Sequence, residues 1–325
     1  MSGLPARCLE LNCDYVKVNA MRTALNPNLF LVGAPKSGTT ALYSYLKRHP
    51  QILMSKIKEP QFFASDVCGD QRCIQTMPEY LACFDSPDKD CVVIGEASTC
   101  YLGSKLAPLE IHRFCPGARV IVMLRNPTDV MYAEHSERVF GGTEHITDFE
   151  VALDSPEPRR WRSGPFKGHL VRNLTYREIT AFSEQVQHYF GVFGKENVHV
   201  IIYDDFAHNP DVAYQSVVSF LGLVPHEDID FNVVNANRSA RSSAVHDLLR
   251  HPPAPAKQLA RALLPQSLRR TLGDCFRWLN VKEAARPLLD DKFRKRIAME
   301  YAPEVSQLSH VLDRDLLSMW IESLT

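Results

Sequence analysis

Four short segments of the chain are continuously apolar instead of alternating between apolar and polar positions. This pattern is typical of strands buried on both faces of a parallel sheet, because neither side of such a strand meets water. We therefore predict a strand at each of these places. The segments are residues 29–34, 92–96, 119–125 and 199–205.

Helical patterns lie between these predicted strands. Apolar side chains recur there every three or four residues, which puts them on one side of a helix. Leu42, Tyr45 and Leu46 form such a stripe in the first segment. The predicted helices cover residues 39–49, 128–140, 175–193 and 211–221. Alternation of strands and helices predicts an α/β fold with a single doubly wound parallel sheet.

Two regions depart from this alternation. Residues 141–172 are polar and rich in glycine and proline, and we expect them to form a lid insertion over a site. Residues 251–255 read HPPAP, which indicates a linker. The predicted organisation is one domain over residues 1–325, with its core at about 27–240 and a helical C-terminal region at 250–325.

The composition of the 325-residue chain disfavours several classes of protein. Hydrophobic residues make up 45% and charged residues 23%, as in an ordinary folded protein rather than a disordered one. Lys and Arg total 37 against 38 Asp and Glu, a net charge of −1, so broad binding of nucleic acid is disfavoured. No apolar run approaches the ~20 residues of a membrane span, and the N-terminus lacks the apolar core of a signal peptide. We therefore expect a cytoplasmic protein, and the sequence gives no oligomeric state.

Nine cysteines are scattered along the chain. An odd and dispersed set is unlike the dense, even frameworks of small disulfide-bonded proteins. Cys68 with Cys73, and Cys8 with Cys13, are close enough in sequence to pair, but we expect free buried thiols.

The strongest chemical signal is the segment GAPKSGTT at residues 33–40, between a predicted strand and a predicted helix. In this setting the N–H groups of the loop and the helix N-terminus converge on one point, which suits an anion. Lys36 adds a positive charge. The hydroxyl donors of the loop are Ser37, Thr39 and Thr40. The nucleotide-triphosphatase loop G-x-x-x-x-G-K-[ST] has the same glycine spacing, but Thr39 occupies its lysine position here.

A second anion-binding position is predicted where the segment 119–125 ends. Arg125 closes this strand. The carboxyl ends of strands in doubly wound sheets face the place where ligands bind, and the planar guanidinium suits a phosphate. The alternative is an arginine that only forms a salt bridge at a strand end.

Four segments resemble the sulfotransferases that use 3′-phosphoadenosine 5′-phosphosulfate (PAPS), in particular their bacterial and carbohydrate branch. They are PKSGTTALYSYLKRHPQI from Pro35, KEPQFF from Lys58, GEASTCYL from Gly95 and LRNP from Leu124. The resemblance implies one α/β domain with a P-loop-like nucleotide-binding core, PAPS as co-substrate and adenosine 3′,5′-bisphosphate (PAP) as product. The sequence shows no His, Cys and carboxylate cluster at metal-ligand spacing, so we expect no metal. It implies that Lys36 contacts the bridging oxygen of the donor. The residues implied to bind its 5′-phosphosulfate are Lys36, Ser37, Gly38, Thr39 and Thr40.

The resemblance also implies a site for the 3′-phosphate of the donor. Arg125 matches the arginine that holds this group. The serine that normally assists it, eight residues later, is replaced by Ala133, and Ser136 is a candidate substitute one helical turn further. Arg238 and Arg241, in NANRSARS, match a loop that contacts the donor or the acceptor.

Candidate catalytic groups follow from the same resemblance. Glu59 matches the glutamate that takes the acceptor proton, and a carboxylate beside a hydroxyl or amine is able to act as a general base. A capping or surface carboxylate is the alternative. The histidine and lysine that assist this glutamate in the carbohydrate branch are replaced here by Gln61 and Ala97, so the acceptor is expected to differ.

Two further expectations concern the acceptor side. Glu96, Ser98 and Tyr101 match the motif that lines it in the resembling family. His135 is a second candidate base, although a lone histidine is more often structural.

The predicted function is in-line transfer of a sulfuryl group from PAPS to a hydroxyl or amine of a small-molecule, carbohydrate or lipid-like acceptor. Two alternatives stay open. A P-loop kinase using Mg-ATP would place its metal-binding aspartate at Asp204 or Asp205, at the end of the last predicted strand. A membrane-surface protein would use the basic, leucine-rich residues 256–280 as an interfacial helix, and the same stretch would give an enzyme a peripheral membrane contact.

Overall fold

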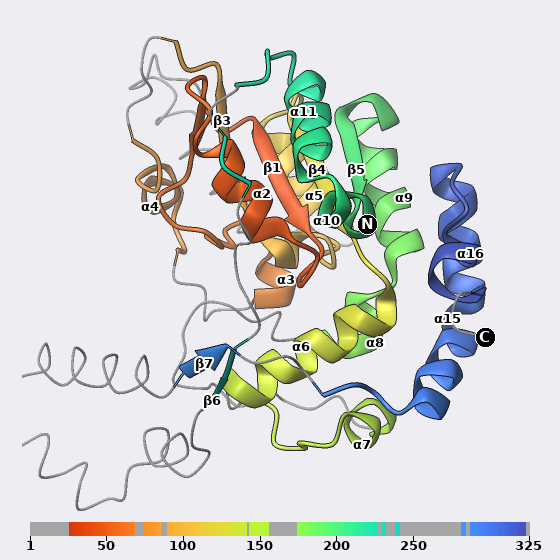
Figure 1. The fold of residues 1–325 in the computed structure, drawn as a ribbon. Coiled ribbons are helices and arrows are strands. Elements are labelled where there is room, and N and C mark those ends of the chain that lie inside the picture. The colour runs from red at the N-terminus through yellow and green to blue at the C-terminus, as the bar shows by residue number, and fades with distance from the viewer. Residues whose placement is uncertain are drawn as a thin grey trace, which may run out of the picture.

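A parallel sheet of five strands lies at the centre of the fold, in the order β2-β3-β1-β4-β5 (Figure 1). The computed structural model describes residues 26–68, 74–85, 90–141, 143–155, 174–226, 229–231 and 287–322, and the backbone of 238–240 and 281–283. The strands of the sheet are β1 (Leu29–Gly33), β2 (Ile52–Met54), β3 (Val93–Ala97), β4 (Arg119–Leu124) and β5 (Val198–Ile202). A separate antiparallel pair consists of β6 (Arg238–Ala240) and β7 (Val281–Glu283).

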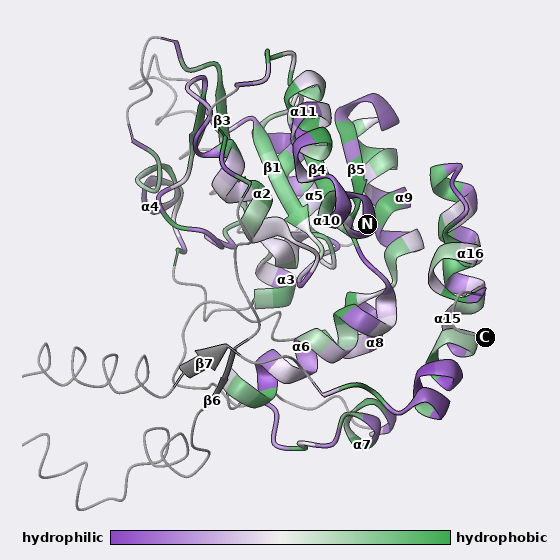
Figure 2. Cartoon of the chain, in the orientation of Figure 1, coloured by the Kyte–Doolittle hydropathy of each residue, from purple (hydrophilic) through white to green (hydrophobic). Residues whose placement is uncertain are grey.

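Side chains of the sheet alternate between two hydrophobic cores. Phe30 and Val32 of β1 belong to one core, whereas Leu29 and Leu31 belong to the other, and all four are fully buried. Burial on both sides explains why the strands are continuously apolar. In Figure 2 the central strands are green, whereas the helices show both colours. The doubly wound α/β sheet predicted from the sequence is confirmed.

Helices cover both faces of this sheet (Figure 1). The face of Leu29 and Leu31 packs against α2 (Thr39–Leu46), α10 (Tyr203–His208) and α11 (Pro210–Phe220). The opposite face carries the larger core, which includes the C-terminal helices. Its helices are α3 (Ser65–Cys68), α4 (Met77–Leu81), α5 (Ala107–Phe114), α6 (Pro127–Gly141), α7 (Phe149–Asp154), α8 (Tyr176–Ile179), α9 (Phe182–Phe193), α15 (Asp291–Leu312) and α16 (Leu316–Trp320). The 3₁₀ turns are η2 (Thr99–Tyr101) and η3 (Lys195–Asn197).

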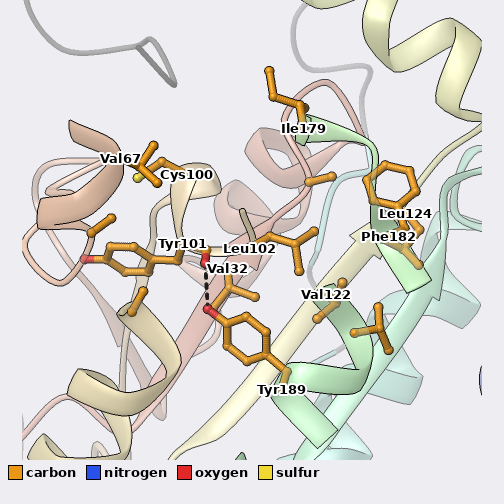
Figure 3. Close-up of a cluster of buried hydrophobic side chains, with 14 of the residues drawn as sticks. Val32, Val67, Cys100, Tyr101, Leu102, Val122, Leu124, Ile179, Phe182 and Tyr189 are labelled. Atoms are coloured by element: carbon orange, nitrogen blue, oxygen red, sulfur yellow. Dashed lines mark hydrogen bonds between the residues drawn. The ribbon is translucent and has the colours of Figure 1, made fainter. Parts of the chain in front are cut away.

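The larger core is closely packed around Val32 of β1 (Figure 3). Val122 of β4 lies in the same cluster, together with Phe182 and Tyr189 of α9. The Tyr189 hydroxyl donates a hydrogen bond of 2.9 Å to the carbonyl of Tyr101. A buried phenol is thereby satisfied, and the turn that follows β3 is tied to α9.

The four predicted strands are confirmed, with differences at their ends. The fifth strand, β2, is not predicted from the sequence, because three residues are too few to show a repeating pattern of apolar positions. The last predicted strand is too long, since the chain becomes helical at Tyr203. Side chains from the C-terminal region hold this helix: Trp320 Nε1 donates to Asp204 at 3.0 Å, and Arg314 pairs with Asp205.

The single helix predicted over residues 175–193 is wrong, because the chain forms α8 and α9 with a break at Thr180. The Thr180 hydroxyl bonds to backbone carbonyls of the preceding turn, which competes with continuation of a helix. A second helix, α9, then begins at Phe182. Glu304 of α15 accepts hydrogen bonds from both the backbone N–H (2.7 Å) and the hydroxyl (2.8 Å) of Ser183.

Parts of two predicted regions lie outside the described residues. The expected lid insertion, 141–172, is described mainly over 143–155, which contain α7. The linker and the stretch 256–280 also lie outside them. Within the described ranges, no helix is both long and apolar enough to span a membrane. The cysteines of these ranges are free, namely Cys68, Cys83, Cys91, Cys100 and Cys115.

We expect Glu304→Ala to lower the free energy of unfolding by about 1–2 kcal/mol, because it leaves the N-terminus of α9 without its acceptor. Glu300→Ala is the matched control, since it is one turn away on α15 and removes only a surface pair with Arg177, which is worth roughly 0–1 kcal/mol. Urea unfolding of both variants measures the difference. Equal losses would show that the cap does not stabilise α9.

Candidate active site

The loop between β1 and α2 has the form of an anion-binding turn. Lys36 and Gly38 have positive φ angles of 62° and 87°. Turns that contain such left-handed residues commonly form anion-binding concavities of backbone N–H groups. Gly38 is the N-cap of α2, and its carbonyl accepts hydrogen bonds from Ala41 and Leu42. The first N–H groups of a helix have no partner within it, so this N-terminus suits a phosphate.

The predicted donor-binding side chains share this turn. Ser37 is fully buried, and its hydroxyl donates to the Pro35 carbonyl at 3.4 Å. Thr39 is buried and Thr40 half-buried in the first turn of α2. Lys36 Nζ lies 2.8 Å from the Glu137 carboxylate of α6, which ties the loop to that helix.

Two glycines make the packing of the loop possible. A Cβ at Gly33 would lie 2.6 Å from Leu102 Cβ and 3.1 Å from the Thr99 carbonyl oxygen. A Cβ at Gly38 would lie 3.1 Å from the Tyr203 ring. Only glycine permits these approaches together with the positive φ angles. The loop is thus fixed between the turn after β3 and the start of α10.

Arg125 lies directly beside the loop, as the sequence predicts. Its Nη1 donates to the Lys36 carbonyl at 3.3 Å, and its Nη2 lies 3.5 Å from Asp129. The guanidinium also stacks over the Tyr203 ring, 4.5 Å from the centroid. The structure therefore brings Lys36 and Arg125 together at the carboxyl ends of β1 and β4.

Glu59 is held against the turn that packs on Gly33. Its backbone has a φ of 66°, and its N–H donates to the Ala97 carbonyl at 2.8 Å. The carboxylate accepts hydrogen bonds from the Thr99 N–H (2.8 Å) and hydroxyl (3.1 Å) and forms an ion pair of 2.6 Å with Lys58. The capping role considered for Glu59 is thus present. Its role as a base stays a prediction.

Glu96 lies behind this turn and is fully buried. Its carboxylate accepts hydrogen bonds from the hydroxyls of Tyr80 (2.9 Å), Tyr101 (2.9 Å) and Ser98 (2.7 Å). The Ser98 hydroxyl in turn accepts one from the Gln61 N–H at 3.0 Å. Glu96, Ser98 and Tyr101 are too buried to line an acceptor surface directly, which corrects that prediction. Instead they support the segment that carries Glu59.

Burial controls the protonation of Glu96. Removal from water raises its pKa to about 7, and the nearby charge of Glu59 acts in the same direction. The three hydroxyl donors oppose this change, because they stabilise the ionised form. Glu96 therefore titrates near neutral pH in the folded protein.

His135 of α6 packs against residues of the neighbouring helices α7 and α8. The side chain is buried, and Nε2 bonds with the Ile146 carbonyl at 2.8 Å. Its ring packs against Phe149 and Tyr176. These contacts correspond to a structural histidine, so the geometry does not support His135 as a base.

The predicted substitute for the missing serine is also engaged elsewhere. The Ser136 hydroxyl donates to the Tyr132 carbonyl of its own helix at 2.8 Å. Ala133 is buried. Arg241 lies outside the described residues, and only the backbone of Arg238 is described.

Three residues of the site are not found from the sequence. Asp129 lies 3.5 Å from Arg125 and 3.2 Å from Arg294 of α15, and Glu137 pairs with Lys36. Asp129 follows Arg125 by four residues, in the first turn of α6, and this short separation in sequence is a usable signal. Glu137 and Arg294 lie 101 and 165 residues from their partners, so no local pattern reveals them.

The profile of the sulfotransferase domain matches residues 26–245. This chain belongs to the sulfotransferase domain family. The match covers the phosphate loop, Glu59 and Arg125, and it ends before α15.

Individual sulfotransferases resemble the chain more distantly. Carbohydrate sulfotransferase 15 of Mus musculus is 25% identical over 266 residues, covering 65% of this chain and 46% of that protein. Bifunctional heparan sulfate N-deacetylase/N-sulfotransferase 1 of Caenorhabditis elegans is 29% identical over 172 residues, covering 49% of this chain and 19% of that protein. The chain thus spans less than half the length of these relatives. A sulfotransferase structure from Alicyclobacillus acidocaldarius shares the fold, with a TM-score of 0.66, 24% identity, and coverage of 91% of this chain and 99% of that one.

We expect Glu96→Gln to flatten the dependence of stability on pH. The folded-state pKa of Glu96 lies above its usual value of 4.5, so the folded protein binds the extra proton and stability falls as pH rises from 4.5 past 7. The contribution lost across this window is at most about 3 kcal/mol. The measurement is urea unfolding of wild type and variant between pH 5 and 8, with Glu110→Gln on the surface of α5 as control. Parallel pH curves for wild type and Glu96→Gln would contradict the prediction.

Proposed function

We propose that this chain transfers a sulfuryl group from PAPS to a hydroxyl or amine of an acceptor. The observation that carries the proposal is the contact of Arg125 Nη1 with the Lys36 carbonyl, at 3.3 Å. It places a guanidinium beside a phosphate loop, at the ends of neighbouring parallel strands. A donor with anionic groups at its 5′ and 3′ positions fits two adjacent cationic sites. Membership of the sulfotransferase domain family supports the same reaction.

The loop and Lys36 act on the leaving group in this proposal. The acceptor atom attacks the sulfur, the bond from sulfur to the bridging oxygen breaks, and PAP leaves with the electron pair. Loop N–H groups and the Lys36 ammonium stabilise the charge that grows on the bridging oxygen. Holding donor and acceptor in line supplies further acceleration. Because these groups and Arg125 provide positive charge, we propose that the transfer proceeds without a metal.

Glu59 is the proposed general base, because it lies beside the turn that contacts Gly33 of the loop. It would take the proton that the acceptor hydroxyl or amine loses. Relatives named for carbohydrate and heparan sulfate support a carbohydrate acceptor. A screen with labelled PAPS separates this class from small-molecule and lipid-like acceptors. The cytoplasmic location and the single domain over residues 1–325 stay predictions.

A Mg-ATP kinase has less support. Asp204 and Asp205 lie in α10, where the Trp320 indole and Arg314 engage their carboxylates. The loop also has Thr39 where the kinase loop has its lysine.

We expect Lys36→Ala and Arg125→Ala each to weaken PAP binding about 10-fold or more, because each removes a charged donor to a phosphate. Calorimetric titration with PAP in the absence of Mg²⁺ measures the affinity. The controls are Lys47→Ala at the other end of α2 and Arg119→Ala at the other end of β4. Unchanged affinity in both site variants would overturn the donor site, and binding of Mg-ATP but not PAP to the wild type would favour the kinase.

We expect Glu59→Gln to keep the PAP affinity and lower kcat about 100-fold or more. The glutamine oxygen still accepts the Thr99 N–H, so the variant removes the base while it preserves the cap. Turnover of labelled PAPS and the thermal midpoint are measured together. A variant as active as the wild type would mean that Glu59 serves only to hold the Thr99 turn.

A further inference from the structure

Asp129 of α6 connects two arginines from distant parts of the chain. Its Oδ2 lies 3.5 Å from Arg125 Nη2, and its Oδ1 lies 3.2 Å from Arg294 Nη2. Arg294 belongs to α15, 165 residues further along the chain. The two guanidiniums therefore each contact one oxygen of the same carboxylate, beside the loop that carries Lys36.

Among the described residues, the ion pairs of these two guanidiniums reach one carboxylate, so the three groups together carry a net positive charge. Arg294 Nε is also buried, and among the described residues it has no hydrogen-bond partner. The side chains of Arg125 and Arg294 remain 23% and 31% exposed, which leaves both accessible to a ligand. Each guanidinium has five N–H donors, and the contacts to Asp129 use few of them.

Arg296, two residues further along α15, is an arginine whose positive charge is balanced by nearby carboxylates. Its Nη2 lies 2.7 Å from Asp154 and 3.4 Å from Glu150, so two carboxylates face one guanidinium. In the part of the chain that the structure describes, Arg294 instead shares the Asp129 carboxylate with Arg125. The contrast indicates that Arg294 is placed for an anion rather than for a surface ion pair.

Contacts with other helices fix the position of α15, the helix that carries Arg294. Phe293 is buried and packs edge-to-face against Phe149, with ring centroids 5.6 Å apart. Further along α15, the Tyr301 hydroxyl bonds to Thr180 at 2.8 Å. A guanidinium on a rigid helix loses less freedom when it binds a ligand than one on a loop.

We propose that Arg294 is a donor-binding residue that holds the 3′-phosphate of PAPS together with Arg125, which rests on the proposed function. Asp129 is a positioning residue that orients the two guanidinium groups. A phosphate dianion matches two guanidinium forks in charge and geometry. Arg294 then supplies donors at a site where Ala133 offers no hydroxyl and the Ser136 hydroxyl is bonded within its own helix.

The test compares two nucleotides that differ only by the 3′-phosphate. PAP and adenosine 5′-monophosphate are titrated calorimetrically into the wild type, Arg294→Met, Arg294→Lys and the control Arg296→Met. We expect Arg294→Met to weaken PAP binding about 10-fold or more and to leave the affinity for adenosine 5′-monophosphate unchanged. Arg294→Lys restores part of the loss, because it returns a charge without the fork. Arg296→Met behaves as the wild type.

Three outcomes separate the possibilities. Equal PAP affinity in Arg294→Met and wild type overturns the role of Arg294 while the proposed function stands. Equal loss for both nucleotides also overturns it, because the effect is then not on the 3′-phosphate. If the wild type binds neither PAP nor PAPS, the proposed function fails and this inference fails with it. Thermal midpoints of all variants identify any loss that comes from misfolding.

Discussion

The approach of Gly33 to the turn after β3 is the constraint on which the site depends. A side chain at Gly33 would collide with Leu102 and the Thr99 carbonyl. The end of β1 and this turn therefore pack closely only because residue 33 is a glycine. The turn is fixed from the other side by Glu59, whose carboxylate accepts the Thr99 N–H. The phosphate loop and the candidate base are therefore positioned by the same few atoms. Neither is able to move without disturbing the other.

A second layer of support lies behind this turn. The fully buried Glu96 carboxylate accepts hydrogen bonds from three hydroxyl groups. One of these hydroxyls, that of Ser98, also accepts a hydrogen bond from the Gln61 N–H. Buried polar networks are costly unless every member is satisfied, but when satisfied they specify a single arrangement. The two left-handed residues of this segment, Glu59 and Gln61, are thereby held in conformations that non-glycine residues rarely adopt.

Local patterns in the sequence predict much of this architecture. The parallel sheet, the loop around Lys36 and the position of Arg125 all follow from short contiguous segments, since each depends on its own strand and the turn after it. Features that depend on distant residues do not follow. The break at Thr180 requires Glu304 to cap the next helix, the end of β5 depends on Trp320 and Arg314, and the partners of Lys36 and Asp129 lie 101 and 165 residues away. The two alternatives for His135 stay open in the sequence for a related reason, because residue type alone does not tell a packed imidazole from a reactive one.

The position of α15 has a consequence for how the protein is made. Its buried side chains, including Phe293, Ile297 and Leu308, complete the core on one face of the sheet. During synthesis this helix emerges after every strand of the central sheet has left the ribosome. Until then, apolar surface on α6 and α9 stays open to water and to other nascent chains, a state prone to aggregation. Packing of this face of the sheet is therefore completed only by a helix that follows all five of its strands in the sequence.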